Sequence, residues 1–333
     1  MSGPPDEFEW IARGLAPLAD GAPEAFGLSD DAAAIPSRPG FDLIVSKDAI
    51  VEGVHFLKDD PPDLVARKLI RVNLSDLAAK GAEPYGYFLA VAWPGNYGWP
   101  EREAFARGLA EDQARFGLKL FGGDTVGTPG PLVASVTILG WVPAGGMVRR
   151  NGARPGDLLL VTGTIGDARL GLAAAKGDEV GISYSDAEWL ADRYRLPEPR
   201  FGLGEAMRRS AHAALDVSDG LITDAGKLAA ASGVGLDIDL DRLPLSEPAA
   251  AWLARAADPL AARIALASGD DLGGDDYEVV CTAPAEGLAD LQAAADEAGM
   301  RLTHIGRATA GSGVRVFAAG SEVEVAQTGY VHR

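Results

Sequence analysis

The sequence predicts a two-domain α/β (α+β) protein, and three observations support this prediction. The chain has 333 residues, enough for about two domains at roughly 100–200 residues each. Short apolar runs of strand length alternate with amphipathic helical stretches along the whole chain. Two segments rich in Gly and Pro, 143–147 and 151–156, lie close together, which is typical of a linker. We therefore divide the chain into an N-terminal domain, residues 1–146, and a C-terminal domain, residues 147–333.

The N-terminal half is expected to alternate strands and helices. Strands are predicted at 42–46, 85–93 and 131–142, and helices at 62–80 and 101–115. Prolines at the start of the first helix and Gly81 after its end suit the two termini. Its Leu69, Val72 and Asp76 share one helical stripe, so an acid continues an apolar face. In the second helix, Asp112 falls on the stripe of apolar residues in the same way.

The C-terminal half repeats this alternation with alanine-rich helices. Strands are predicted at 157–162, 213–217, 234–240, 277–282, 301–306 and 314–318. Cys281 lies in the apolar run Val-Val-Cys-Thr, where we expect a buried and inert thiol. A mixed set of strands with helices between them is the expected architecture of this half.

Charge and composition exclude several classes of protein. Asp and Glu number 48 against 30 Lys and Arg, a net charge of −18, which disfavours nucleic-acid or anionic-membrane binding in the absence of a segregated basic patch. The acidic N-terminus does not resemble a signal peptide, and no apolar run approaches the roughly 18 residues of a membrane span. A single Cys excludes an intrachain disulfide. We expect a soluble cytoplasmic protein.

Aspartates in apolar surroundings or beside glycines are the main functional signal. They are Asp30, Asp31, Asp48, Asp76, Asp124, Asp216, Asp219, Asp275 and Asp276. An ionised carboxylate near apolar residues is unfavourable unless it is paired or bound to metal. Few basic residues lie beside these clusters, and aspartate oxygens suit Mg²⁺ that shares its shell with substrate phosphates. Gly-Gly before Asp124, where a strand is expected to end, and before Asp275 would let backbone approach a phosphate.

Each of these signals also has an ordinary structural interpretation. A single Asp of this kind is commonly a helix cap or a turn residue, and Asp219 before Gly-Leu-Ile-Thr is an example. His55 taken alone suits a structural histidine. The P-loop, nucleophile-elbow and zinc-protease motifs are absent, and the turn Gly163-Thr-Ile-Gly166 is a weak dinucleotide signal. The case for a Mg²⁺ and phosphate site therefore rests on the clusters taken together.

In order and spacing, the clusters resemble the thiamine-monophosphate kinase family of the superfamily that includes aminoimidazole-ribonucleotide (AIR) synthase. The matching motifs are Asp30-Asp-Ala-Ala, Ser46-Lys-Asp, Glu52-Gly-Val-His-Phe, Val72-Asn-Leu-Ser-Asp, Gly122-Gly-Asp-Thr, Arg150-Asn-Gly-Ala-Arg-Pro-Gly-Asp, Leu215-Asp-Val-Ser-Asp-Gly-Leu, Gly273-Gly-Asp-Asp-Tyr-Glu and Gly329-Tyr. The resemblance spans about residues 26–330 and implies an AIR synthase-like architecture, with N-terminal mixed-sheet domains that pair in a homodimer. It implies direct in-line transfer of the ATP γ-phosphoryl to thiamine monophosphate, assisted by several Mg²⁺ ions.

The resemblance also assigns residues by position. The implied metal ligands are Asp31, Ser46, Lys47, Asp48, Asp76, Asp124, Asp216 and Asp219. The implied ATP contacts are Gly123, Asp124, Arg150 and Ser218, and the implied thiamine-phosphate contacts are His55, Asp275 and Tyr330. Asp124, Asp216 and Arg150 form the catalytic set.

The effects of departures from the family pattern are undecided, and two other functions are also considered. Lys47 stands where Thr is usual, so it either replaces the charge of one ion or points away. Asp275 replaces the usual Glu, and the near-duplicated segment around it leaves Asp270 or Asp271 as alternatives. The other functions are a different ATP-dependent synthetase of the AIR synthase type and a non-catalytic nucleotide- or metal-binding regulator. Selenophosphate synthetases and hydrogenase-maturation relatives are disfavoured because Cys281 is neither N-terminal nor C-terminal.

Overall fold

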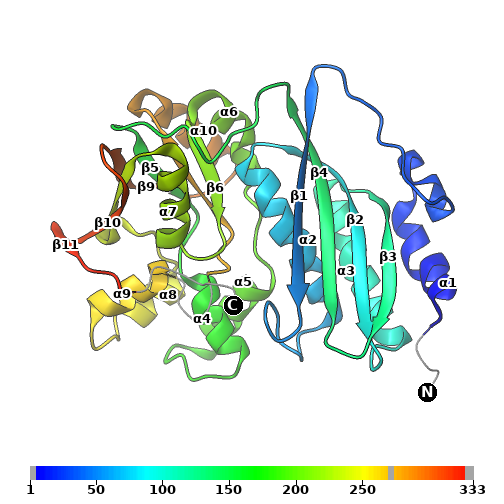
Figure 1. The fold of residues 1–333 in the computed structure, drawn as a ribbon. Helices are drawn as coiled ribbons and strands as arrows, with labels where there is room; N and C mark the ends of the chain where they lie inside the picture. Colours follow the sequence, from blue (N-terminus) through cyan, green and yellow to red (C-terminus); the bar gives the residue numbers. More distant parts are fainter. Residues whose placement is uncertain (1–4, 269–273, 327–333) are drawn as a thin grey trace. The chain divides into compact units, whose positions relative to one another are not determined.

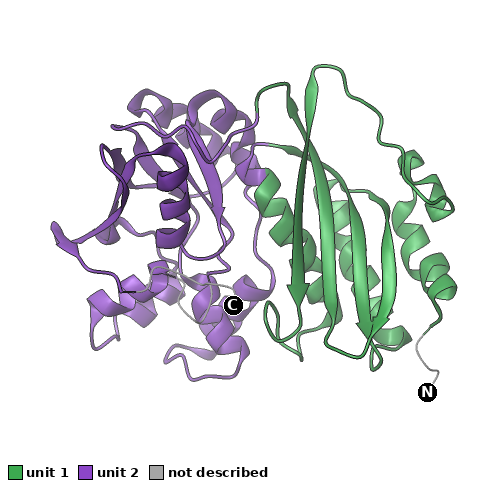
Figure 2. Ribbon diagram, viewed as in Figure 1, with its two compact units in different colours: residues 1–77, 82–146 green, residues 78–81, 147–333 purple. Residues whose placement is uncertain are grey.

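The computed structural model describes residues 5–268 and 274–326 of the chain (Figure 1). By internal contacts the chain divides into unit 1, residues 1–77 and 82–146, and unit 2, residues 78–81 and 147–333 (Figure 2). Each unit combines helices with a mixed β-sheet, which confirms the predicted α/β class.

Unit 1 is built on a mixed sheet in the strand order β1-β4-β2-β3. Its elements are α1 (Glu7–Trp10), the short turns η1 (Ile11–Leu15), η2 (Ala16–Ala19) and η3 (Pro23–Leu28), β1 (Phe41–Val51), α2 (Pro62–Ala79), β2 (Glu83–Pro94), α3 (Trp99–Phe116), β3 (Leu120–Thr128) and β4 (Val133–Pro143). Only the β2–β3 pair is parallel among the described pairs of this sheet. The predicted strands and helices of this half are all present, and Gly81 has the left-handed φ of +67° expected after a helix.

Strand β3 runs farther than the sequence predicts. The expected strand end at Gly122-Gly123-Asp124 is wrong, because β3 continues to Thr128 in parallel register with β2. A Cβ on Gly123 would lie 1.7 Å from the carbonyl oxygen of Leu89, so glycine is required for this close approach of two strands. Gly123 is therefore needed for the pairing of β3 with β2.

Helices α2 and α3 cover one face of the unit 1 sheet. Trp93 of β2 packs edge-on against Phe105 of α3, with ring centroids 5.3 Å apart. Between the two helices, Asp112 is fully buried and accepts hydrogen bonds from Arg71 Nε at 2.7 Å and Arg67 Nε at 3.2 Å. The acid predicted on the apolar stripe of α3 is therefore an internal partner for two arginines of α2.

Unit 2 contains a larger mixed sheet in the strand order β11-β10-β7-β9-β5-β8-β6. Its strands are β5 (Leu158–Thr162), β6 (Ala213–Val217), β7 (Gly235–Asp239), β8 (Glu278–Ala283), β9 (Leu302–Thr309), β10 (Gly313–Ala318) and β11 (Ser321–Val323). Its helices are α4 (Asp167–Ala175), α5 (Tyr184–Arg195), α6 (Gly204–Ser210), α7 (Leu221–Ser232), α8 (Glu247–Leu253), α9 (Pro259–Ser268) and α10 (Leu288–Glu297), with short turns η4 (Phe201–Leu203), η5 (Leu240–Arg242) and η6 (Ala285–Gly287). All six predicted strands are present, and β11 is additional. None of the described helices is both long enough and apolar enough to cross a membrane.

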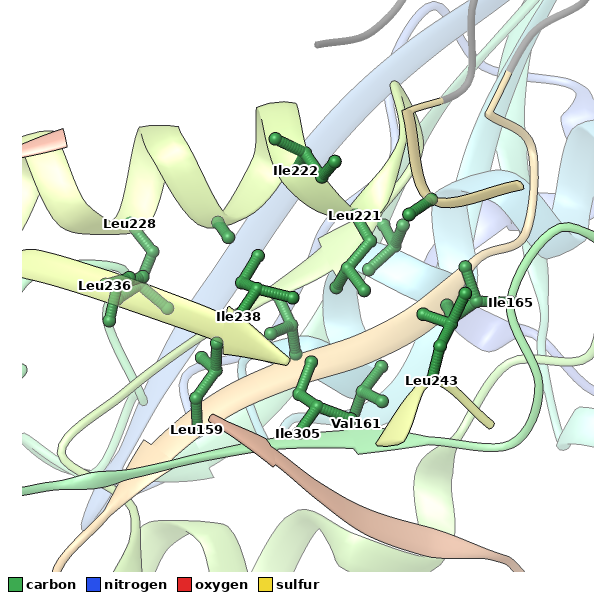
Figure 3. Packing of buried hydrophobic residues seen from close by; sticks show 14 of the residues in the cluster. Leu159, Val161, Ile165, Leu221, Ile222, Leu228, Leu236, Ile238, Leu243 and Ile305 are labelled. Carbon is green, nitrogen blue, oxygen red and sulfur yellow. The ribbon is translucent and has the colours of Figure 1, made fainter. Parts of the chain in front are cut away.

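The unit 2 sheet is buried on both faces because its strands alternate side chains between two cores. Leu159 and Val161 of β5 join the core under α7, whereas Leu160 between them joins the core with α6 and α10. Figure 3 shows the first of these cores, with Leu228 of α7 close to Leu236 of β7. Cys281 belongs to the second core, which confirms that it is buried; burial raises the pKa of its thiol to about 12, so we expect the thiol to be unreactive.

Candidate active site

Strand β1 and helix α2 bring a predicted pair of metal ligands together within unit 1. The Ser46 hydroxyl donates to Asp76 Oδ2 at 2.5 Å, and the Asp48 backbone N–H donates to Asn73 Oδ1 at 2.9 Å. Alternation along β1 places Ser46 and Asp48 on the face that α2 covers. Asp76 therefore lies on the face of α2 that contacts the sheet, as the spacing of Leu69, Val72 and Asp76 predicted.

Lys47 lies on the opposite face of the same sheet. Its Nζ donates to Ser135 Oγ of β4 at 2.8 Å, and Ser135 Oγ in turn donates to the Asp48 carbonyl at 3.0 Å. The register that aligns Ser135 with Ala90, and Ala90 with Asp124, puts Asp124 on this face as well. The strand register thus separates Lys47 and Asp124 from Ser46 and Asp48.

A cavity of about 430 Å³ in unit 1 includes the Gly-Gly-Asp motif in its wall. It is lined by Gly123, by the acids Asp31 and Asp124, and by apolar residues that include Ile11 and Phe88. A pocket lined by apolar residues together with acids and glycine has the mixed character of a small-molecule site.

His55 follows β1 in a tight turn that fixes its protonation pattern. The Val51 N–H donates to His55 Nδ1 at 3.1 Å, so Nδ1 is an acceptor and the ring proton is on Nε2. The buried Lys68 ammonium donates to the His55 carbonyl at 2.8 Å. The histidine therefore has a structural role in the turn, and its Nε2–H gives it the chemistry of a hydrogen-bond donor.

In unit 2, the end of β6 and the start of α7 form a backbone turn held by a buried acid. Asp224 Oδ2 accepts the backbone N–H groups of Ser218 at 2.9 Å and Asp219 at 2.8 Å. Lys227 Nζ contacts Asp224 Oδ1 at 2.6 Å and also pairs with the Asp219 carboxylate. Burial raises the pKa of Asp224. Asp216, just before this turn on β6, is half-buried.

The second Gly-Asp motif lies beside this turn. Asp275 N donates to the Ser218 carbonyl at 2.9 Å, and Tyr277 N donates to the Val217 carbonyl at 2.8 Å. Asp275 and Tyr277 have positive φ angles of 48° and 49°, each of which costs about 1 kcal/mol in a residue with a side chain. The surrounding contacts must therefore stabilise residues 275–277 in this conformation.

The sequence did not predict the hydrogen-bond partners of two buried acids that follow Asp275. Asp276 is 3% exposed and accepts from Gly166 N at 2.8 Å and Ala168 N at 3.1 Å, at the start of α4. Glu278 is fully buried and accepts from Thr162 Oγ1 at 2.7 Å and Arg200 Nε at 2.6 Å. The only sequence signal for these partners is the pair of glycines in the turn 163–166.

We expect the Asp276 carboxyl to make stability fall as pH rises. Desolvation raises its pKa well above the ordinary value of 3.8, so the native protein keeps a proton that the unfolded chain has released. This contribution is complete below pH 3.8 and is lost as pH rises through the native pKa. The unfolding free energy of the wild type minus that of Asp276→Asn, measured by urea titration, should be larger at about pH 5 than at about pH 8. A difference that is constant with pH would contradict this expectation.

The other predicted site residues differ in how much the structure says of them. Arg150 is exposed in the segment between β4 and β5, and Asp31 is exposed after η3. Tyr330, Asp270 and Asp271 lie outside the described residues. Within 5–268 and 274–326, no three or more His, Cys, Asp or Glu side chains gather closely enough to hold a metal ion.

Comparison with known proteins gives a consistent result over nearly the whole chain. Residues 29–142 match the family "AIR synthase related protein, N-terminal domain", and residues 154–319 match its C-terminal counterpart. A thiamine-monophosphate kinase of Caulobacter vibrioides is 52% identical over 99% of this chain and 92% of its own length.

Solved structures agree with these matches. The crystal structure of a thiamine-monophosphate kinase from Stenotrophomonas maltophilia K279a has a TM-score of 0.81 at 36% identity, covering 95% of this chain and 98% of its own. The structure "AaThiL complexed with AMPPCP and TMP" has a TM-score of 0.75 at 29% identity, covering 98% and 99% of the two chains.

Proposed function

This chain belongs to the AIR synthase-related superfamily and, within it, to the thiamine-monophosphate kinases, and from this premise we propose how its residues act. The reaction is direct in-line transfer of the ATP γ-phosphoryl group to the phosphate of thiamine monophosphate, which yields thiamine diphosphate and ADP. The observation that carries this proposal is 52% identity over 99% of the chain to a kinase of that name. A related structure that holds AMPPCP and TMP further supports it.

Phosphoryl transfer depends mainly on positioning and on neutralising charge. We assign ATP contacts to Gly123, Asp124, Arg150 and Ser218. The guanidinium of the exposed Arg150 can donate to phosphate oxygens, whereas the missing side chain of Gly123 leaves room for the backbone of the neighbouring strand β2. Support for this assignment comes from the cavity that Gly123 and Asp124 line.

The donors at the proposed metal positions fit Mg²⁺. They are carboxylate and hydroxyl oxygens, and the hydrogen bond between Ser46 and Asp76 brings two such donors together. The residues that would hold the ions are Asp31 and Asp124, which line one cavity, Ser46, Asp48 and Asp76, which belong to the other face of that sheet, and Asp216 and Asp219 in unit 2. When bound, Mg²⁺ neutralises the phosphate charge that a −18 chain would otherwise repel. Lys47, on the other face, adds a positive charge near Asp48 without being an oxygen donor.

Three residues are assigned to the acceptor substrate. The Asp275 carboxylate suits the positive charge of the thiazolium ring, and the Tyr330 ring suits the face of that cation. His55, with its proton on Nε2, suits a hydrogen bond to an anionic or carbonyl-type oxygen.

We expect Tyr330→Ala to raise the KM for thiamine monophosphate more than the KM for ATP. Removing the ring removes the stacking surface for the cationic acceptor and leaves the nucleotide contacts in place. Steady-state kinetics with each substrate varied in turn checks this. A selective loss of ATP affinity would move Tyr330 out of the acceptor site.

The face of the unit 1 sheet that carries Lys47 is proposed to pair two copies of the chain. Leu43, Val45 and Val126 share this face by register and are 37%, 56% and 51% exposed. An exposed apolar sheet face of this kind suits a symmetric contact with a second copy of itself. Val45→Asp should convert a dimer into a monomer in sedimentation velocity, whereas Leu260→Asp on α9, at a residue 41% exposed, should not. A monomeric wild type would refute the pairing.

The function is tested by assaying ADP formation with ATP and Mg²⁺, with and without thiamine monophosphate, and identifying the product by mass. Thiamine diphosphate formed in equal amount to ADP is the expected result. Turnover only with an aminoimidazole-ribonucleotide precursor would favour an AIR synthase-type activity. Absence of turnover with both acceptors would favour the non-catalytic binding protein.

A further inference from the structure

The turn at 163–166, which no part of the proposed nucleotide site uses, is shaped around two acids of the 274–278 segment. Gly166 N donates to Asp276 Oδ2 at 2.8 Å. A Cβ on Gly163 would lie 2.1 Å from Glu278 Oε1, so only glycine leaves room for that carboxylate. Both glycines also have left-handed φ angles, +54° and +90°. The turn therefore packs against Asp276 and Glu278, the two acids that follow Asp275 in the chain.

Donors from separate segments hold the Glu278 carboxylate. Thr162 Oγ1 at the end of β5 donates at 2.7 Å, Arg193 Nη2 of α5 at 3.2 Å, and Arg200 Nε at 2.6 Å. Thr162 Oγ1 also accepts the Val279 N–H at 2.8 Å, which ties the start of β8 to the end of β5. Because Glu278 is fully buried, these donors replace the hydration it loses.

Residues 275–277 are consequently fixed from both sides. On one side, Asp276 is held by backbone N–H groups at the start of α4, and Glu278 is held by Thr162 of β5, Arg193 and Arg200. On the other side, the backbone N–H groups of Asp275 and Tyr277 bond to the strand β6 and the residue after it. A Cβ on Gly274 would lie 2.4 Å from Ser218 O, so the two segments are in close contact.

We infer that Thr162, Arg193 and Arg200 are positioning residues for Asp275 and so set the affinity for the acceptor substrate. By fixing Glu278 they hold residues 275–277 in a positive-φ conformation that the chain does not favour locally, and this conformation aims the Asp275 side chain. The inference rests on the proposed function, in which Asp275 meets the cationic ring of thiamine monophosphate. The inference adds Thr162, Arg193 and Arg200 to the residues that influence acceptor binding, although they lie far along the chain from the motifs predicted to contact the acceptor.

The test compares KM values for the two substrates in matched variants. Thr162→Val keeps the shape of the side chain but loses its hydroxyl, Thr162→Ser keeps the hydroxyl, and Arg200→Met removes the guanidinium whose Nε lies 2.6 Å from Glu278. Arg315→Met is the control, because Arg315 makes a two-point ion pair with Asp237 on β7 of the same sheet. Thermal unfolding of each variant separates loss of stability from loss of positioning.

Thr162→Val and Arg200→Met are expected to raise the KM for thiamine monophosphate by about fivefold or more, with the KM for ATP changed by less than about twofold. Thr162→Ser should restore the wild-type value, and Arg315→Met should lower stability without a selective change in either KM.

Equal changes in both KM values, or a selective effect in Arg315→Met, would overturn the inference. If Arg200→Met does not fold, the Thr162 pair decides the question alone. A wild type that forms no thiamine diphosphate would overturn both the proposed function and this inference, whereas an active wild type with unaffected variants would overturn only the inference.

Discussion

Asp124→Ala and Asp216→Ala are each expected to abolish turnover, with kcat lowered by at least about a thousandfold. Each change removes carboxylate oxygens from the set proposed to hold Mg²⁺ beside the ATP phosphates, and an alanine methyl group cannot replace a metal ligand. Asp124 lies on strand β3 and Asp216 on strand β6, so the two variants test one member of the set in each unit.

The measurement is thiamine diphosphate formation at saturating substrates, together with Mn²⁺ binding followed by calorimetry. Both variants should bind fewer ions than the wild type while retaining its sedimentation coefficient and its circular dichroism. Asp178→Ala is the matched control, because Asp178 is exposed in the loop after α4 and takes no part in the proposed site. Near wild-type activity in either site variant would remove that residue from the metal set.

The largest effect on stability is expected from Asp112→Ala, which should lower the unfolding free energy by about 3–5 kcal/mol. Asp112 is fully buried and accepts two hydrogen bonds from Arg71, at 2.7 and 3.1 Å, and one from Arg67 at 3.2 Å. Without the carboxylate, the Arg71 side chain, itself 3% exposed, stays buried with its charge uncompensated by this partner. Urea unfolding followed by tryptophan fluorescence measures the loss.

Glu111→Ala provides a close control for this prediction. Glu111 is the preceding residue on α3, and its side chain is 55% exposed in a 3.0 Å ion pair with Arg67, so its removal should cost less than about 1 kcal/mol. The double change Asp112→Leu with Arg71→Met should recover much of the lost stability, because it removes both buried charges of the pair together. Equal losses for Glu111→Ala and Asp112→Ala would show that burial is not the cause.

Much of the fold could be predicted from the sequence because the signals for helices and strands are local. The stripe that contains Leu69 and Asp76 predicts α2, and the apolar run around Leu160 predicts β5, without knowledge of what packs against either. The prediction for the end of β3 was wrong for the same reason. Gly123 is typical of a turn by itself, and a glycine inside a strand is explained only by the parallel neighbour β2, whose Leu89 carbonyl oxygen would lie 1.7 Å from a Cβ at this position.

The features of the candidate site likewise separate into those that depend on neighbours in the chain and those that depend on tertiary packing. The sequence by itself determined the α/β class, the two halves, the acidic motifs and their resemblance to a kinase family, because each depends on residues that are neighbours in the chain. Only the tertiary structure decided that Lys47 faces away from Ser46, that Asp112 pairs with Arg71, and that Glu278 is held by Thr162 and Arg200. Asp112 and Arg71 are 41 residues apart in sequence, and Glu278 and Thr162 are 116 apart. The choice among distant partners depends on strand register and on burial, both of which arise only when the elements pack together.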